Sequence, residues 1–409
     1  MKRILLLCFI CCAFAANAQD MEYFVKLGLQ NSPLLKDYQN QINQSFIDSL
    51  LIKADSKPRI DGNAQILFQP FSDNFGYDNA ITNGGNYNAL VSVSQVILNR
   101  KILESRYQDV NLQRQSVANT SKITGNDVRK LIVSNYLTAY SDYYELNFNT
   151  DFLKLLYQQK DILKNLAEKG IYKQTDYLSF LIEIQNQEMQ ILQLTNQYKK
   201  DIHALNQVCG ISDTKKYDLV YPELKKQKNT DISNTPQMFQ FRLDSLKLVN
   251  QRAIVDNKYR PTVSWFADAG FLSSDASQIY KYPGFSAGLN LNFHLYDGRQ
   301  RQLNYQKLSI QETTRNYYIE AYKKQYNEQL NQLNEMLLSN TIMEEQLKKQ
   351  QATANELIDI FKLQLNVGNV SVTDMINAVK NYVNINKTLN QLKINSLQMI
   401  NEYNYLMME

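Results

Sequence analysis

Residues 367–376 read VGNVSVTDMI and repeat the pattern of residues 169–178, which read KGIYKQTDYL. In each stretch a glycine is followed by Thr five residues later, by Asp six residues later, and by an apolar residue two positions after the Asp. The matched pairs are Gly170 and Gly368, Thr175 and Thr373, Asp176 and Asp374, and Leu178 and Ile376, all at an offset of 198 residues. Because this offset is about half of the chain, the pattern indicates an internal duplication.

Three other pairs of segments match at nearly the same offset. They are Asn31-Ser32-Pro33 with Asn234-Thr235-Pro236, ADSKPRI at 54–60 with VDNKYRP at 255–261, and QVILNRK at 95–101 with FHLYDGR at 293–299. The offsets stay between 198 and 203 residues, which favours a tandem repeat over chance agreement. The sequence therefore predicts a first repeat over residues 19–209, a linker over 210–235 and a second repeat over 236–409.

Each repeat has the same predicted order: a helix, two short extended runs, a very long helix, the glycine turn and a further helix. The scarcity of helix breakers, 13 Gly and 7 Pro, favours long helices. They are expected at about 20–55, 100–168 and 174–208, and again at about 236–257, 299–366 and 373–407. The longest would reach about 100 Å, so such helices must pack side by side in the manner of a coiled coil. Only Ile123-Thr124-Gly125-Asn126-Asp127 is expected to interrupt or kink the first long helix.

Between the helices the apolar period changes from 3.6 to 2 residues. Four runs near 59–70, 86–98, 261–273 and 284–297 place apolar side chains on one face and polar side chains on the other. Their length, their alternation and the aromatic residues at their loop ends match transmembrane β-strands. The residues expected to face lipid are Ile66, Phe68, Val91, Val93, Trp265, Phe271, Leu289, Leu291 and Phe293. Two hairpins packed on a soluble core would have the same local pattern, and this alternative stays open.

Four strands cannot close a barrel, and open sheet edges are not tolerated in lipid. If these runs face hydrocarbon, several copies of the chain must share one barrel. This reasoning requires an oligomer and leaves the number of copies open.

The first residues, MKRILLLCFICCAFAANAQ, have the basic start, the short apolar run and the small-residue cleavage site of a secretory signal peptide that ends at Ala18. Its removal leaves Cys209 as the one cysteine, which excludes an intramolecular disulfide and a cysteine metal site. The formal charge of +4 falls to +2, so no electrostatic pattern favours nucleic acid. No later segment has even 15 unbroken apolar residues, so no transmembrane helix is expected.

Patterns for catalysis and metal binding are missing from the sequence. His203 and His294 fall in different predicted elements, and the chain has no GxSxG, phosphate-loop or HExxH motif. The sequence therefore predicts no enzyme, no metal and no cofactor.

Together, the signal peptide, the two repeats and the G-x-x-x-x-T-D turn in each repeat resemble the TolC family of outer-membrane efflux proteins over essentially the whole mature chain. Each motif is weak alone, whereas the order, spacing and duplication are specific. The resemblance implies a mainly α fold with a small β part. In that fold three identical chains share a 12-stranded transmembrane β-barrel, and their helices form a tunnel across the periplasm. It also implies an outer-membrane location and two partners, a periplasmic adaptor and an inner-membrane efflux or ABC transporter.

In this family the two glycine turns are the tips of helical hairpins that meet the adaptor, so the resemblance makes Gly170, Ile171, Gly368 and Asn369 candidates for docking. The family also carries two acidic positions whose rings constrict the closed periplasmic aperture. The first falls on Asp374, whereas the second is Asn377 here, so the constriction is expected to be less anionic. Asp176 is the equivalent of Asp374 in the first repeat and is a further aperture candidate.

A purely local role explains Asp176 and Asp374 equally well. An Asp at a helix start, next to possible caps such as Ser371 and Thr373, is stabilised by the exposed N–H groups and the helix dipole by about 0.3–1 kcal/mol. Capping and gating are compatible roles. The favoured function is a passive exit duct for efflux or type I secretion, and the alternative is a soluble periplasmic or surface coiled-coil scaffold.

Overall fold

The structure is a computed structural model that describes residues 18–68, 85–212 and 217–408. The expected signal peptide, apart from Ala18, lies outside the described residues. The chain divides into two units. Unit 1 consists of Met1–Lys36, Ser121–Pro236 and Ala321–Glu409, and unit 2 consists of Asp37–Thr120 and Gln237–Glu320.

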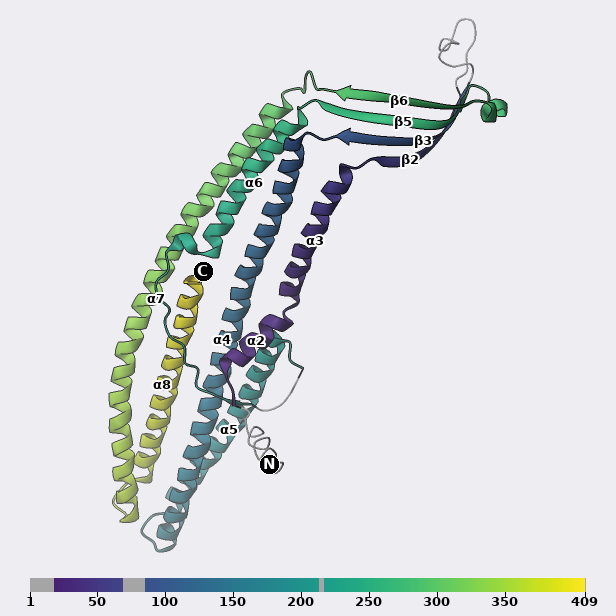
Figure 1. The fold of residues 1–409 in the computed structure, drawn as a ribbon. Helices are drawn as coiled ribbons and strands as arrows, with labels where there is room; N and C mark the ends of the chain where they lie inside the picture. The colour runs from purple at the N-terminus through teal and green to yellow at the C-terminus, as the bar shows by residue number, and fades with distance from the viewer. Residues whose placement is uncertain (1–17, 69–84, 213–216, 409) are drawn as a thin grey trace, which may run out of the picture. The chain divides into compact units, whose positions relative to one another are not determined.

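Unit 2 contains a four-stranded antiparallel sheet in the order β2-β3-β5-β6 (Figure 1). Its strands are β2 (Arg59–Phe68), β3 (Gly85–Ile97), β5 (Thr262–Ser273) and β6 (Pro283–Asn292). A 3-10 helix, η2 (Ala276–Lys281), lies between β5 and β6. Two hairpins were expected, and the structure confirms them; in addition, β3 pairs with β5 and joins them into one sheet.

The last strand is shorter than the pattern predicts. β6 ends at Asn292, opposite Thr262, whereas the alternation suggests a strand to about residue 297. In this register Phe293 would stand opposite Pro261, which has no N–H to donate, so the ladder stops there. Residues 69 and 70, the predicted end of the first strand, lie outside the described residues.

A helix adjoins each strand at the end away from the hairpin loops (Figure 1). These helices are α3 (Pro33–Asp55), α4 (Arg100–Glu168), α6 (Pro236–Lys258) and α7 (Gln300–Asn366). In unit 1, α5 (Gln174–Cys209) follows α4 and α8 (Val372–Leu406) follows α7, which gives two helical hairpins. The mainly α fold with a repeated order of elements is therefore confirmed.

Short elements complete unit 1. Helix α2 (Met21–Asn31) precedes α3, and β1 (Ala18–Gln19) pairs in parallel with β4 (Asp218–Leu219). A 3-10 helix, η1 (Ile232–Asn234), precedes α6. Among the residues that the structure describes, no helix combines the length and apolarity that a membrane span needs.

Two details of the helix prediction are wrong. The first predicted helix is divided at Ser32, whose N–H donates to the Gly28 carbonyl and whose hydroxyl accepts from the Leu35 N–H. Pro33 favours this break because it is well suited to the first turn of a helix and not to an interior position. By contrast, α4 runs without interruption through Gly125. One interior glycine costs only about 1 kcal/mol, which tertiary packing of the neighbouring turns offsets.

Unit 1 buries apolar side chains in three clusters. The largest brings α2, α4, α5 and α8 together around Phe24, Ile132 and Leu137, which are fully buried. Gly28 allows α2 to approach α4, since a Cβ there would lie 2.2 Å from Ile132 Cδ1. The second cluster, which includes Leu163, joins the tips of the two helical hairpins, and the third packs α7 against the end of α8.

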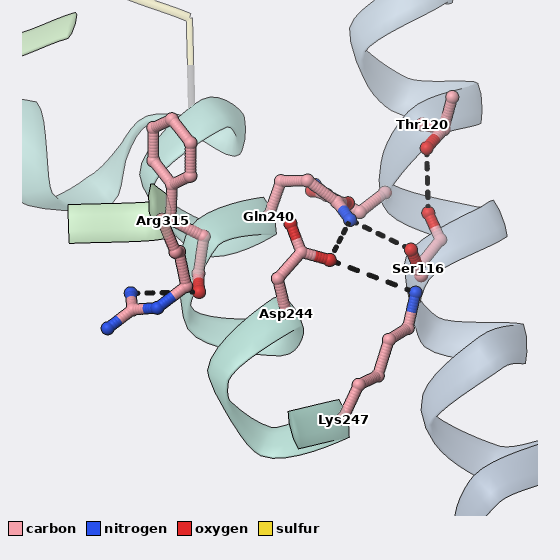
Figure 2. Close-up of polar contacts among 8 residues, drawn as sticks. Ser116, Thr120, Gln240, Asp244, Lys247 and Arg315 are labelled. Carbon is pink, nitrogen blue, oxygen red and sulfur yellow. Dashed lines mark hydrogen bonds and ion pairs between the residues drawn. The ribbon is translucent and has the colours of Figure 1, made fainter. Parts of the chain in front are cut away.

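Unit 2 buries mainly polar side chains between α4 and α6. We call Ser105, Ser116, Asn119, Gln240, Asn250 and Asn257 the polar seam. Figure 2 shows one part of it, where Gln240 Nε2 donates to Ser116 Oγ at 2.8 Å. Further along, Asn257 Nδ2 donates to Ser105 Oγ at 2.8 Å. Leu112 and Leu243 are the fully buried large apolar side chains among the described residues of this unit.

Candidate functional site

The strand register gathers the apolar side chains of all four strands on one face of the sheet. Val93 stands opposite Ile60 of β2 and Ala267 of β5, and Ala267 stands opposite Ala287 of β6. Since side chains alternate along a strand, every second residue from these positions shares the face. The face therefore includes eight of the residues expected to meet lipid: Ile66, Phe68, Val91, Val93, Trp265, Phe271, Leu289 and Leu291. Phe293 follows the end of β6 by one residue.

Much of this apolar face is open. Ile66 has 81% of its surface exposed and Leu289 has 75%. No apolar cluster of the described residues covers either side chain. Exposed apolar patches of this kind mark surfaces that meet another protein or a membrane.

The opposite face of the sheet carries hydrogen-bonding side chains. Asn88 Nδ2 donates to Gln65 Oε1 at 3.2 Å, and Ser286 Oγ donates to Asp268 Oδ2 at 3.3 Å. Phe266 also lies on this face, against Gly288, where an added Cβ would approach its ring to 2.7 Å. The sheet thus has one apolar face and one largely polar face, as the alternation predicts.

Trp265 lies on the apolar face near the end of the sheet where the helices begin. Its indole N–H donates to Gln95 Oε1 at 3.0 Å, and Gln95 Nε2 donates to the Ser56 carbonyl at 2.8 Å. The polar atom of the indole is therefore satisfied at the boundary between the sheet and the helices. Trp at such a boundary suits a membrane interface, where one side of the ring is apolar and the other is wet.

The two outer strands of the sheet each have one unpaired edge among the described residues. β2 pairs only with β3, and β6 pairs only with β5. Open edges present rows of backbone donors and acceptors that need partners when water is absent.

The two glycine turns have the same backbone geometry. Gly170 and Gly368 adopt left-handed φ angles of 74° and 76°. The N–H of the next residue, Ile171 or Asn369, reaches back to a carbonyl five residues earlier, at 3.0 Å in both turns. This Schellman arrangement ends α4 and α7, and it explains why a glycine recurs at this place in each repeat.

The two turns also touch each other. Tyr172 Oη donates to the Val370 carbonyl at 3.0 Å, and a Cβ at Gly368 would lie 2.6 Å from Ile171 Cγ2. Near the turns, Lys380 of α8 pairs with Glu183 of α5 at 2.9 Å. The four docking candidates therefore lie on neighbouring turns, with Ile171 half exposed at 51%.

The two equivalent aspartates differ in their surroundings. The Asp176 carboxylate accepts the backbone N–H of Lys173 at 3.2 Å, so it caps the start of α5. Asp374 and Asn377 are exposed near the start of α8. Ser371 occupies the N-cap position of α8 but forms no side-chain cap bond, and Thr373 lies inside the helix. The local capping role thus holds for Asp176 more clearly than for Asp374.

Sequence reasoning missed a carboxyl cluster inside unit 1. Burial, a side-chain hydrogen bond to Asp201 and the nearby charge of Glu145 raise the pKa of Asp142 to about 8. Burial also raises the pKa of Glu145, against the nearby charge of Lys387. No sequence signal pairs Asp142 with Asp201, because they lie on different helices and 59 positions apart.

A small hollow adjoins this cluster between α4, α5 and α8. Its volume is about 190 Å³, and Glu145, Asn149, Gln187 and Asn386 contribute polar atoms to its walls. Gln187 Nε2 donates to Asn149 Oδ1 at 2.7 Å. Across the described parts of the chain, no three His, Cys, Asp or Glu side chains come together in a way that could hold a metal ion.

No protein-family model matches the chain, and no curated protein matches its sequence. Several solved structures share its fold. The channel protein CusC matches with a TM-score of 0.75 at 12% identity, over 94% of this chain and 91% of that chain. The CmeC outer-membrane channel of Campylobacter jejuni matches with 0.72 at 12% identity, over 95% and 85%. The open MtrE outer-membrane channel of Neisseria gonorrhoeae matches with 0.74 at 9% identity, over 94% and 88%. This chain therefore has the fold of outer-membrane channel proteins, the fold that its resemblance to the TolC family implies.

Proposed function

We propose that the chain is an outer-membrane exit duct that passively conducts substrates delivered by a periplasmic adaptor and an inner-membrane transporter. The apolar, uncovered face of the sheet carries this proposal. A sheet with one apolar face and one polar face suits a barrel wall between lipid and a water-filled lumen. The fold shared with outer-membrane channels supports the same role.

The unpaired edges of β2 and β6 support a barrel shared between chains. Four strands per chain and three chains would close a 12-stranded barrel, an even number within the range of bacterial barrels. In this arrangement β6 of one protomer pairs with β2 of the next, so that no edge remains in lipid. Residues 1–18 serve as the signal peptide, and each of the two repeats supplies one hairpin to the barrel.

The glycine turns form the periplasmic end of the duct. The adaptor contacts Gly170, Ile171, Gly368 and Asn369, which lie close together and come from both repeats. Asp374 faces the aperture, where three copies of its carboxylate attract cations. Asn377 adds no charge, and Asp176 caps its own helix.

The test is the behaviour of the mature protein in detergent and in a planar bilayer. We expect a particle of three chains by light scattering, and ion conductance that prefers cations. Asp374→Asn should lower the cation preference, whereas Asp359→Asn, an exposed carboxylate farther up α7, should leave it unchanged. A monomer that stays in solution without detergent and forms no pores would support the scaffold alternative.

Adaptor docking needs a separate test in cells. A photo-crosslinking residue at Asn369 should capture a periplasmic protein, and the same residue at Lys349, farther from the turn on α7, should not. Equal capture at both positions, or capture at neither, would contradict docking at the turns.

A further inference from the structure

The end of the sheet where the helices begin carries an excess of positive charge. The four junctions between strand and helix lie in the stretches 57–61, 97–101, 258–262 and 292–300. They contain seven Lys and Arg residues and only two Asp residues. Both carboxylates are already engaged. Asp61 pairs with Arg59 at 2.8 Å, and Asp297 accepts the backbone N–H groups of Arg299 and Arg301 at 2.9 and 2.8 Å.

The side chains of six of these seven cations form no ion pair with a carboxylate among the described residues. We call them the basic collar: Lys57, Arg100, Lys101, Lys258, Arg260 and Arg299. Every junction contributes at least one of them. All are exposed except Arg260, which is half-buried.

The collar surrounds one end of the sheet, because the register brings the four junctions to the same end. Arg59 pairs with Ser94, Ile97 with Val263, and Thr262 with Asn292. The ends of β2, β3, β5 and β6 that adjoin the helices therefore lie side by side at this end of the sheet (Figure 1). These strand ends are close in the chain to Lys57, Lys101, Lys258 and Arg299.

The opposite end of the sheet has no such excess of positive charge among the described residues. Among the described residues, the segment between β5 and β6, residues 274–282, contains one Asp and one Lys. Among the described residues of the sheet, the excess of positive charge thus lies at the helix end. General solubility would not require such a difference between the two ends.

Aromatic and apolar side chains accompany the collar. Trp265 lies on the apolar face within five residues of Arg260, and Leu295 and Tyr296 are exposed at 89% and 83% beside Arg299. Arg and Lys next to such a boundary extend their charged ends toward lipid phosphates while their stems cover apolar surface. Each basic residue near an anionic membrane surface contributes attraction that salt weakens.

We propose that the basic collar binds the phosphate headgroups of anionic phospholipids in the leaflet next to the helices. This inference rests on the proposed function, because it requires the apolar face of the sheet to lie in a bilayer. The collar then sets the depth of the sheet in the membrane: the apolar face contacts acyl chains, and the collar contacts the headgroups at its helix end.

The chain contains a single tryptophan, Trp265, and its place beside the collar makes it a suitable reporter. The full mature protein is reconstituted into vesicles that contain brominated phosphatidylglycerol or brominated phosphatidylcholine at the same mole fraction. Bromine quenches tryptophan fluorescence at short range. We expect phosphatidylglycerol to quench Trp265 more strongly, with a relative binding constant about fivefold higher, and we expect added salt to reduce this preference.

The test variant removes one collar charge at each junction through Lys57→Gln, Lys101→Gln, Lys258→Gln and Arg299→Gln. The control variant removes four exposed charges from unit 1 through Lys164→Gln, Lys199→Gln, Lys200→Gln and Lys349→Gln. The test variant should lose the preference for phosphatidylglycerol and still be quenched by phosphatidylcholine. The control variant should keep the preference.

The outcomes separate this inference from the proposed function. If neither brominated lipid quenches Trp265, the sheet is not in the bilayer and both are wrong. If both lipids quench the native protein equally, or if the test variant keeps the preference, the collar does not bind anionic headgroups although the sheet is inserted. Loss of the preference on adding inorganic phosphate at constant ionic strength would identify a free-anion site and overturn the role of the membrane lipid.

Discussion

The two units of the chain differ in how they bury and expose apolar side chains. Unit 1 encloses Phe24, Ile132 and Leu137 in apolar clusters, beside buried polar groups such as Asn149 and Asn390. Unit 2 encloses hydroxyl and amide groups in its polar seam and leaves Ile66 and Leu289 exposed. The contiguous apolar face of the sheet indicates different surroundings, because a large apolar surface is unfavourable in water and marks a site that another protein or a membrane covers.

The largest expected difference between the units concerns removal of a buried leucine. Leu137→Ala should lower the free energy of unfolding of unit 1 by about 2–5 kcal/mol, because it leaves a cavity in a fully buried cluster. Leu289→Ala in unit 2 should change it by less than about 0.5 kcal/mol in detergent, because that side chain packs on no protein core. Urea unfolding followed by circular dichroism measures both. Similar costs would mean that Leu289 is covered by protein.

A charge on the apolar face should act on membrane insertion. Leu289→Arg should cost about 2–4 kcal/mol near the bilayer midplane. Asn290→Arg, on the opposite face of the same strand, is the matched control and should cost much less. Urea titration of insertion into vesicles measures the difference. Equal effects at the two positions would show that both faces meet water.

The polar seam provides a smaller test of the contrast. Asn257→Ala removes the donor to Ser105 Oγ and to the Lys101 carbonyl, and it should cost about 1–3 kcal/mol because these buried groups lose their partner. Asn257→Leu should cost at least as much. Thermal unfolding of the detergent-solubilised protein measures both variants. A leucine that stabilises unit 2 would show that its interior accepts apolar residues as unit 1 does.

The smallest expected effect is a pH dependence between about pH 4 and pH 8 that arises from Asp142 in unit 1. The pKa of Asp142 is raised by burial in the folded state to about 8, so the folded chain holds this proton more tightly than the unfolded chain does. Stability from this group is therefore present at low pH and is lost as pH rises from about 4 to about 8. Asp142→Asn should flatten this dependence and raise the unfolding temperature at pH 8 by roughly 2–4 °C. The seam of unit 2 consists of uncharged groups, so Asn257→Ala should shift the unfolding temperature equally at pH 5 and pH 8. An unchanged slope in Asp142→Asn would contradict the raised pKa.

The local patterns predicted much of the fold. The alternation of apolar residues identified four strands and assigned Val91, Trp265 and Leu289 to one face, since the period of 2 depends only on neighbouring residues. The repeated glycines identified both helical turns, since Gly170 and Gly368 supply the left-handed angle that a Schellman turn needs. The break at Ser32 was missed although Pro33 marks it, and the interruption expected at Gly125 does not occur.

Other features could not be read from local patterns. Tyr172 and Val370 lie 198 positions apart, and only the packing of two hairpins brings them within hydrogen-bonding distance. The same is true of Asp142 on α4 and Asp201 on α5. Burial in this packing raises the pKa of Asp142. The polar seam was also missed, because serine and asparagine at helical spacing suggest a wetted face until a second helix is seen to cover them.

The sequence by itself determined which residues form helices and strands, which side of each strand is apolar, and that the chain repeats one unit. These properties depend on spacing along the chain and on the conformational freedom of single residues. Only the tertiary structure decided that β3 pairs with β5, that polar groups fill the interior of unit 2, and that six cations of four junctions border one end of the sheet. Those properties depend on the register and packing of segments far apart in the chain, and no local preference encodes them.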